Sequence, residues 1–273
     1  MTQFTPEAAI WYENMPGTGL GNLFAVNIST PGLSMRYPNI HCLSDHSVCQ
    51  VTTGESEINA ATTMTAVLLS SAFDFRTTYF LLAGIAGVSP KYSTLGGVAL
   101  ARYSVQVALQ YEFDAREMPT NFSTGYLPYG VLHPDEYPTS TYGTEVMELN
   151  VALRDRAYEF ALNGRLADNP EATTYRSRYE GMDGCSPALL QPSVVKCDTA
   201  TSDVYYSGAL LSEAFENVTT AWTNGTGQYC MTAQEDNAIL EVLVRMDIAE
   251  MVDFSRAIVM RTGKADACCE VNR

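Results

Sequence analysis

Two stretches of this 273-residue chain have residue types and spacing that could do chemistry. Glu235 follows the apolar run 229–232, and a carboxylate beyond the end of a strand can accept hydrogen bonds from two neighbouring hydroxyl groups. The sequence Gly84-Ile-Ala-Gly87 follows another apolar run, 77–83. We expect it to end a buried strand in a turn whose backbone N–H groups converge on a ligand. Taken by itself, a Gly-x-x-Gly sequence favours a tight turn that only packs closely.

These residues need a scaffold, and the pattern along the chain predicts alternating helices and strands. Helical spacing covers 6–13, 56–71, 145–161 and 234–251, and dense apolar runs predict strands at 77–83, 98–107, 229–232 and 256–261. This alternation favours a layered α/β fold, in which ligands bind beyond the carboxyl ends of the strands. The connection 118–142 is long and rich in Pro, Gly, Tyr and Thr, which is typical of a functional loop.

The composition argues against two classes of partner. A net charge of −15 and a pI of about 4.5 do not suit nucleic acid or an anionic membrane, which need a basic surface. No stretch has the ~20 mostly apolar residues of a membrane span, and the first residues lack the pattern of a signal peptide. We therefore expect a soluble chain of unassigned compartment. Four N-glycosylation sequons leave a secretory or cell-surface ancestry open, and they begin at Asn27, Asn121, Asn217 and Asn224.

The seven cysteines are an odd number, and their pairing cannot be read from the sequence. His41, Cys42, His46 and Cys49 bring zinc-ligand types close together. Their spacing matches no established zinc finger, and no second pair of ligands follows. Loop residues or a local disulfide are therefore favoured, and no metal is predicted.

The motifs and their order resemble the methylthioadenosine/adenosylhomocysteine nucleosidases and purine nucleoside phosphorylases, and more closely the purine nucleoside permease family. The signatures are 80–92, 110–117, 142–146 and 229–237, and the resemblance extends from about residue 4 to residue 262. It implies one domain over residues 1–273, a three-layer αβα sandwich around a mixed central sheet. It also implies a purine nucleoside ligand and no cofactor, with phosphate as a possible co-substrate and a homo-oligomer as a possible assembly.

The resemblance also implies roles for single residues near the ribose. Glu235, with Gln234 beside it, grips the ribose hydroxyls, although an acidic residue in the first turn of a helix is also favoured by the helix dipole. Ile85 and Ala86, inside the glycine-rich stretch, lie beside the ribose. Glu7 matches a glutamate that positions the attacking water, against the alternative of a surface residue at a helix start.

A second element, Asp203-Val-Tyr-Tyr206, resembles the family element whose aromatic residue stacks on the base, which implies that role for Tyr205. A tyrosine in such a segment is equally often an ordinary core residue.

The sequence departs from the family where the catalytic acid is expected. An aspartate there protonates or hydrogen-bonds purine N7, which neutralises the charge of the leaving base. The strand 258–262 is in place, but Gly263-Lys-Ala-Asp266 replaces the Ala-Ser-Asp of the family. Asp266 stands in for the acid, or the acid is missing. An N-terminal strand before Phe4 and a closing helix after the aspartate also have no counterpart, so the chain looks truncated at both ends.

The leading prediction is therefore cleavage of the N-glycosidic bond of a purine nucleoside by hydrolysis or phosphorolysis. A phosphate site would need an arginine or an amide cradle, and Arg102, Arg116 and Arg261 are the candidates. Two alternatives stay open: a nucleoside-binding component of an uptake system, and an altered scaffold recruited to another pathway.

Overall fold

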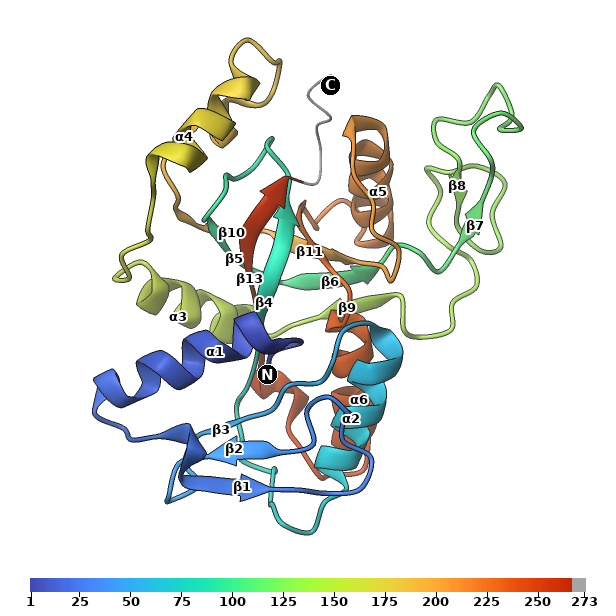
Figure 1. Cartoon of the computed structure of the whole chain (residues 1–273). Coiled ribbons are helices and arrows are strands. Elements are labelled where there is room, and N and C mark those ends of the chain that lie inside the picture. Colours follow the sequence, from blue (N-terminus) through green and yellow to red (C-terminus); the bar gives the residue numbers. More distant parts are fainter. Residues whose placement is uncertain (267–273) are drawn as a thin grey trace. The chain divides into compact units, whose positions relative to one another are not determined.

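The computed structural model describes the backbone of residues 1–266 and the side chains of residues 1–264 (Figure 1). The chain groups into two compact units, residues 1–84 with 238–257, and residues 85–237 with the chain from residue 258 onward. Strand β4 (Phe80–Val88), helix α6 (Asp236–Ile248) and strand β13 (Ala257–Asp266) contribute to both units. The helix expected over 234–251 and the strand expected over 256–261 are therefore confirmed.

The first unit is built from short elements. They are α1 (Thr5–Asn14), the 3-10 turns η1 (Met15–Thr18) and η2 (Leu23–Ala25), strands β1 (Val26–Ile28), β2 (Ile40–Cys42) and β3 (Cys49–Gln50), helix α2 (Glu57–Leu68) and η5 (Phe254–Arg256). The three strands form an antiparallel sheet in the order β1-β2-β3. Helix α2 buries Ala60, Met64, Val67 and Leu68, three or four residues apart, which confirms the helix predicted from that spacing.

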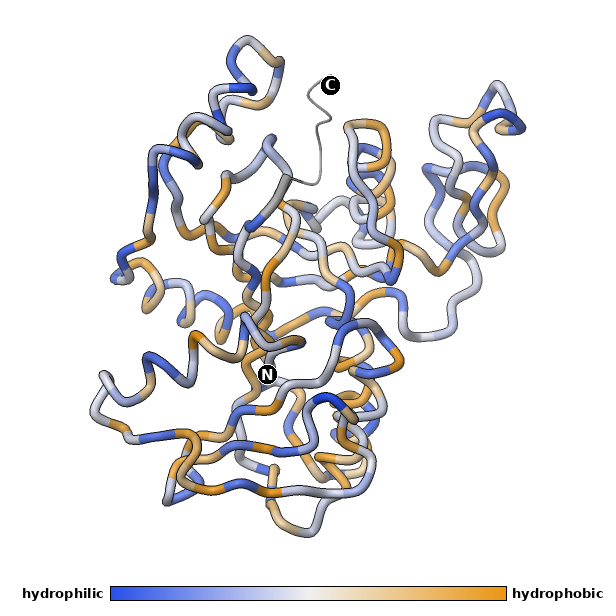
Figure 2. Tube along the Cα trace, viewed as in Figure 1, coloured by the Kyte–Doolittle hydropathy of each residue, from blue (hydrophilic) through white to orange (hydrophobic). Residues whose placement is uncertain are grey.

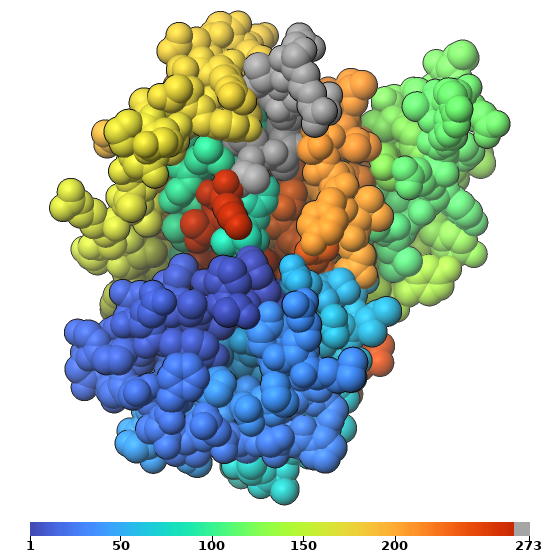
Figure 3. Space-filling view, in the orientation of Figure 1, coloured from blue at the N-terminus to red at the C-terminus, as the bar shows by residue number. Residues whose placement is uncertain are grey.

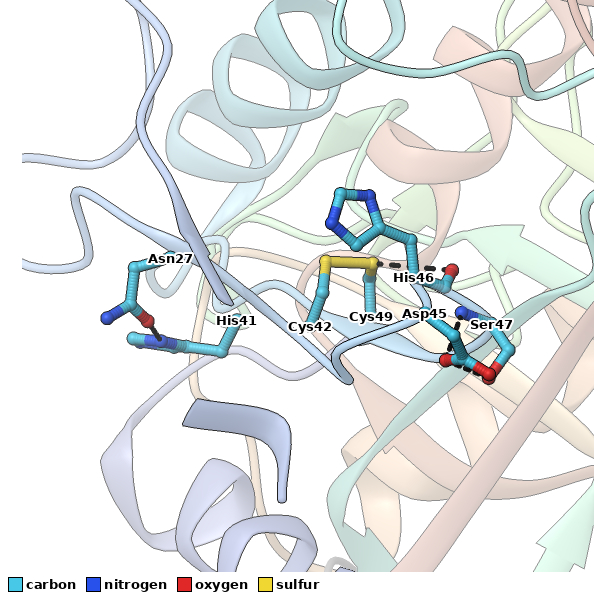
Figure 4. The surroundings of a disulfide bond; sticks show 7 residues. All are labelled: Asn27, His41, Cys42, Asp45, His46, Ser47 and Cys49. Carbon is cyan, nitrogen blue, oxygen red and sulfur yellow. Dashed lines mark hydrogen bonds between the residues drawn. A yellow bond between two sulfur atoms is a disulfide. The ribbon is translucent and has the colours of Figure 1, made fainter. Parts of the chain in front are cut away.

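The local disulfide favoured by the sequence is present between β2 and β3. Cys42 and Cys49 are bonded and pair across the two strands, and His46 lies in the turn between them with a φ of 60° (Figure 4). His41 Nδ1 instead lies 2.5 Å from Asn27 Oδ1 on β1. Within residues 1–264, whose side chains the structure describes, no group of three or more His, Cys, Asp or Glu side chains could hold a metal ion.

The second unit carries the large sheet. Its remaining elements are β5 (Val98–Leu100), β6 (Tyr103–Gln106), β7 (Tyr111–Glu112), β8 (Tyr126–Leu127), β9 (Val146–Glu148), α3 (Val151–Ala161), α4 (Pro170–Arg176), η3 (Ser177–Tyr179), η4 (Ser186–Leu189), β10 (Val194–Lys196), β11 (Asp198–Thr201), α5 (Ala209–Trp222) and β12 (Tyr229–Ala233). The order across the sheet is β10-β5-β13-β4-β12-β11-β6-β9.

The sheet is mixed, as expected. Strands β12, β11 and β6 run parallel, as do β10 and β5, whereas the pairs β12–β4, β13–β5 and β6–β9 are antiparallel. The central strand β4 is hydrophobic along most of its length (Figure 2). Helix α5 buries Phe215, Val218 and Trp222 in a cluster with Tyr103 and Tyr229 of the sheet. This mixed sheet with packed helices confirms the predicted α/β class.

The prediction that Gly84–Gly87 ends the strand in a turn is wrong. Strand β4 continues through both glycines to Val88, and neither glycine has a positive φ. Because β4 pairs with β13 on one side and β12 on the other, a turn there would lose the backbone hydrogen bonds of a central strand. Glycine inside a strand is typical of a place where another group approaches the backbone closely.

Two further elements differ from their predictions. The strand expected over 98–107 is divided into β5 and β6, which occupy separate places in the sheet, because the chain crosses between them at Ala101 and Arg102. The helix expected over 145–161 begins only at Val151, after the short strand β9. Asn150 sets that start, since its side chain accepts a hydrogen bond from the backbone N–H of Leu153 at 3.2 Å.

Candidate functional site

Most of the predicted ligand-binding residues gather at one edge of the large sheet. Strands β11 and β12 run parallel and end together, with Thr201 opposite Ala233, and Ser202 N donates to the Ala233 carbonyl at 3.0 Å. The segment 202–208 therefore leaves the sheet at the same edge as 234–237. This is the carboxyl end of parallel strands, where ligands bind in open α/β sheets.

A buried ion cluster occupies this edge. Arg261 of β13 reaches two consecutive carboxylates, with Nη2 2.5 Å from Asp236 Oδ1 and 3.4 Å from Glu235 Oε2. The side chains of all three residues are at most 3% exposed. The other end of the guanidinium, Nη1, donates to the Ile85 carbonyl at 3.3 Å. One arginine therefore joins β13, β4 and the start of α6.

The two carboxylates of this cluster share one guanidinium. With both carboxylates ionised, the three side chains sum to one negative charge. Asp236 is the nearer counter-ion, because its second oxygen also accepts from Arg261 Nε at 3.4 Å. Glu235 makes the longer contact. Such an arrangement fixes the Glu235 carboxylate in a site of low dielectric, where it can attract a developing positive charge strongly.

A neighbouring polar network holds the start of α6 in place. Asn237 Oδ1 accepts from Ser104 Oγ at 2.7 Å, and Asn237 Nδ2 donates to the Thr144 carbonyl at 2.8 Å. Thr199 Oγ1 in turn donates to Ser104 Oγ at 3.0 Å. These bonds connect α6 to β6, β11 and the chain before β9, so the backbone that carries Glu235 is held from several sides.

The glycine-rich stretch contributes backbone to the same edge. Gly87 N donates to Thr232 Oγ1 at 2.7 Å, and the Ile85 carbonyl receives Arg261 as described above. Ala86 is buried, whereas Gly84, Ile85 and Gly87 are partly exposed. The predicted residues are thus near the Glu235 cluster, but they lie on an extended strand rather than in a cradle of converging N–H groups.

The other glycine pair, Gly96-Gly97, is needed for close packing against β13. Gly96 has a φ of 80°, and its N–H donates to the Gly263 carbonyl at 2.7 Å. A Cβ added at Gly97 would lie 2.5 Å from Ser93 Oγ and 2.9 Å from the Thr94 carbonyl oxygen. These glycines let the loop approach the end of β13.

The segment after β11 presents its predicted residues outward. Asp203 and Tyr205 are exposed, Tyr205 at 82%, so Tyr205 is not an ordinary core residue. The adjacent Tyr206 packs edge-on against Phe215, and its hydroxyl lies 3.3 Å from that of Tyr229. Tyr206 therefore anchors the segment, and Gln234, which is partly exposed, follows the neighbouring strand.

The end of β13 lies in a hollow of the surface, between the segment around α4 and helix α5 (Figure 3). Asp266 is the last residue of β13, and its side chain lies outside the described part of the structure. Its predicted role as the acid stays a prediction.

Glu7 belongs to the first unit and is buried, at 6% exposure, rather than on the surface as a simple helix-start residue would be. It lies in the first turn of α1, and its Oε2 accepts from the backbone N–H of Gln3 at 2.7 Å. Its predicted role with water stays a prediction.

The three arginines considered for a phosphate site are each paired with carboxylates. Arg102 bonds Glu148 at 2.6 Å, Arg116 bonds Asp114 at 2.6 Å, and Arg261 holds the cluster described above. Side chains already neutralised in this way are weaker anion ligands.

The ion pair between two residues of the cluster, Arg261 and Asp236, was not predicted from the sequence. Arg261 was considered only as a phosphate ligand, and Asp236 was not singled out. The signals are an arginine directly after the apolar run 257–260 and a run of four polar residues, 234–237, between a strand and a helix. A buried arginine is almost always paired with a carboxylate, so these two signals together indicate the ion pair.

Comparison with known proteins agrees with this fold and these motifs. A family model described as "Purine nucleoside permease (NUP)" matches residues 1–265. A purine nucleoside permease of Candida albicans is 46% identical over 242 residues, which are 88% of this chain and 59% of that protein. A probable purine nucleoside permease of Schizosaccharomyces pombe is 38% identical and is covered over 75% of its length. The chain thus spans about three fifths of the length of the Candida relative.

Solved structures share the fold at low sequence identity. The 5′-methylthioadenosine/S-adenosylhomocysteine nucleosidase of S. pneumoniae, solved with a transition-state inhibitor, has a TM-score of 0.55 and 13% identity, with 98% of this chain and 84% of that chain covered. The corresponding nucleosidase of Colwellia psychrerythraea, solved with adenine, has a TM-score of 0.52 and 14% identity, with 98% and 81% covered. Within residues 1–266 no helix is both long and apolar enough to cross a membrane. This chain belongs to the purine nucleoside permease family.

Proposed function

We propose that the chain binds a purine nucleoside at the carboxyl edge of β11 and β12 and cleaves its N-glycosidic bond. The observation that carries this proposal is the buried Glu235–Asp236–Arg261 cluster at that edge. The similarity in fold to solved nucleosidases supports the reaction type, and the family name supports the purine nucleoside as ligand.

Glu235 is the proposed ribose ligand. A carboxylate can accept from the 2′- and 3′-hydroxyl groups together, and Arg261 fixes its position. When the glycosidic bond breaks, the ribose becomes an oxocarbenium-like cation. A fixed carboxylate beside the ribose would stabilise that cation more than the neutral ground state, which is the condition for catalysis.

The remaining residues are assigned around this carboxylate. Tyr205, exposed next to the same edge, stacks on the purine base, and Asp203 and Gln234 contact the nucleoside. Asp266 at the end of β13 is the proposed acid for the leaving base. Glu7 keeps its proposed role as the counterpart of the glutamate that positions the attacking water. Phosphate remains a proposed alternative to water as nucleophile.

The test is release of free base from inosine, adenosine and guanosine, followed by chromatography, with and without phosphate. We expect turnover by the wild type and a loss of about 10²–10³-fold in Glu235→Gln, the range found when one transition-state contact is removed. Glu148→Gln is the matched control, since Glu148 also pairs with an arginine but at the exposed surface. Equal loss in both variants would contradict the assignment of Glu235. Dependence of the rate on phosphate would identify phosphorolysis.

A second function is favoured by the names of the relatives. A nucleoside-binding component of an uptake system would use the same edge and the same Glu235 without breaking the bond. Saturable binding of inosine with no release of hypoxanthine from the folded protein would support this function over the enzyme.

The compartment is also a proposal. Two disulfides, Cys42–Cys49 and Cys197–Cys230, are typical of an oxidising compartment. All four sequon asparagines are exposed. We infer that the chain is suited to the secretory pathway. Expression there should give a mass shift that an endoglycosidase removes, and a chain without attached glycan would contradict this inference.

A further inference from the structure

The four glycosylation sequons differ in the residues that precede them. Three of their asparagines have an aromatic residue two or three positions earlier, and these pairs are Phe24–Asn27, Phe215–Asn217 and Trp222–Asn224. Phe215 and Trp222 are buried in the core, whereas Phe24 is 48% exposed. Asn121 has no aromatic residue at the corresponding positions. Among the four, Asn27 is therefore the one with an exposed aromatic ring shortly before it in the chain.

Asn27 and Phe24 also contact the same histidine in the first unit. Asn27 of β1 pairs with His41 of β2 across the small sheet, and its Oδ1 lies 2.5 Å from His41 Nδ1. The ring of Phe24 meets the ring of His41 edge-on, with the two ring centroids 4.8 Å apart. The imidazole thus brings the amide of Asn27 and the phenyl ring of Phe24 close together.

The hydrogen bond to His41 leaves the amide nitrogen of Asn27 accessible. The carbonyl oxygen of the amide accepts this bond, and Figure 4 shows the nitrogen, Nδ2, pointing away from the imidazole. Asn27 is exposed, and so is Ser29, the third residue of its sequon. Because an N-linked glycan is attached to the side-chain amide nitrogen, a glycan at Asn27 can extend into solvent while the contact with His41 is kept.

The ring of Phe24 is held in place by its other neighbours. Its backbone N–H donates to Asn22 Oδ1 at 2.8 Å at the start of η2, and its ring centroid lies 4.5 Å from that of Tyr12 on α1. Since Tyr12 and His41 support the ring and nearly half of the residue is still exposed, Phe24 offers a fixed apolar surface. The face of an aromatic ring carries partial negative charge, which suits the C–H groups of a sugar.

We propose that Asn27 carries an N-linked glycan whose first sugar packs on the exposed part of Phe24, an inference that rests on the secretory assignment made above. The donor is a lipid-linked oligosaccharide diphosphate of the secretory pathway. A bond forms between Asn27 Nδ2 and the anomeric carbon of the first sugar, and the bond from that carbon to the donor phosphate breaks. The amide proton and the lipid diphosphate are released. Because the sugar covers apolar surface of Phe24, the glycan stabilises the first unit.

Attachment is tested by mapping glycopeptides of the full chain after its expression in the secretory pathway of a eukaryotic host. We expect a glycan at Asn27. Glycans at other asparagines but not at Asn27 would overturn this proposal and leave the secretory assignment standing. A chain without any glycan would contradict both.

Packing is tested by thermal unfolding after an endoglycosidase has trimmed every glycan to its first sugar. The comparison is with Ser29→Ala treated in the same way, since that variant loses the sequon but keeps Asn27 and its bond to His41. We expect the wild type to have a midpoint about 2–4 °C higher than that of Ser29→Ala, as one additional contact gives in a chain of this size. Equal midpoints would overturn the proposed packing.

A double-mutant cycle separates contact with Phe24 from a general effect of the glycan. Phe24→Leu keeps an apolar side chain but removes the flat ring, so the midpoint difference caused by Ser29→Ala should largely disappear in the Phe24→Leu background. Asn121→Gln is the matched control, because it removes a sequon that no aromatic residue precedes, and it should leave the midpoint unchanged. An undiminished difference in Phe24→Leu, or an equal loss in Asn121→Gln, would contradict the contact with Phe24.

Discussion

The two ends of the parallel strands β11 and β12 hold buried carboxylates in contrasting ways. At the amino end, Asp198 accepts three backbone N–H groups, from Arg102 at 2.9 Å, Tyr103 at 2.8 Å and Gln228 at 2.6 Å. At the carboxyl end, Glu235 and Asp236 face the side chain of Arg261. Both groups are almost completely buried, so burial alone does not distinguish the two ends.

The difference lies in what each carboxylate holds. Asp198 binds main-chain donors from the corner between β5 and β6 and from the residue before β12, so its bonds fix the path of the backbone. The carboxyl end instead places two acidic side chains around one guanidinium. That arrangement links the carboxylates to β13 through the side chain of Arg261. We therefore assign stability to the Asp198 end and ligand chemistry to the Glu235 end.

The largest expected effect is that of removing the cation from the carboxyl end. Arg261→Met would leave two carboxylates buried without their counter-ion, and breaking a buried pair in this way costs about 3–5 kcal/mol of unfolding free energy. Urea denaturation measures this loss. Arg102→Met is the matched control, because Arg102 pairs with Glu148 at the surface and should lose no more than about 1 kcal/mol. Similar losses of unfolding free energy in the two variants would contradict the claim that the ion pairs of Arg261 are buried.

A substitution at the amino end of β11 and β12 should lower stability without changing nucleoside affinity. Asp198→Asn replaces one acceptor oxygen with an NH₂ group that faces backbone donors, and we expect a loss of about 1–3 kcal/mol in urea denaturation. Nucleoside affinity, measured by calorimetry on the folded variant, should stay within about twofold of the wild type. A large loss of affinity without a loss of stability would reverse the roles of the two ends.

A smaller effect follows from the pKa of Asp198. Burial raises this pKa above the ordinary value of 3.8, against the lowering effect of the three N–H donors. The folded state therefore binds the proton more tightly than the unfolded state. The stability from this group is fully present below the unfolded pKa and is lost as pH rises through the folded pKa. In the wild type, the urea midpoint should therefore fall as pH rises through the folded pKa of Asp198. In Asp198→Asn this fall should be absent. Identical pH profiles would contradict it.

Much of the fold could be predicted from the sequence, because α2, α6, β12 and β13 are set by local patterns of apolar residues. The break between β5 and β6 could not, since it depends on Asp198, almost a hundred residues away. The path of β4 through Gly84–Gly87 was also missed, because local glycine preference is outweighed by pairing on both sides.

One part of the candidate site could likewise be predicted from the sequence, and another part could not. Glu235 was found from its motif, and the pairing of β11 with β12 brings it to the edge from which the Asp203–Tyr205 segment departs. The role of Arg261 depends on the antiparallel course of β13 through the sheet, which no local pattern specifies. The long range of that contact explains why the ion pairs of Arg261 with Glu235 and Asp236 were not predicted from the sequence.

The central claim is that Glu235 binds the ribose hydroxyl groups, and a comparison of two ligands tests it most directly. Calorimetry would measure the affinities of inosine and 2′,3′-dideoxyinosine for the wild type and for Glu235→Gln. Hydrogen bonds to a charged group are worth about 1.5–3 kcal/mol. We therefore predict that the wild type prefers inosine by about tenfold or more, and that most of this preference disappears in Glu235→Gln. An undiminished preference in the variant would contradict the account.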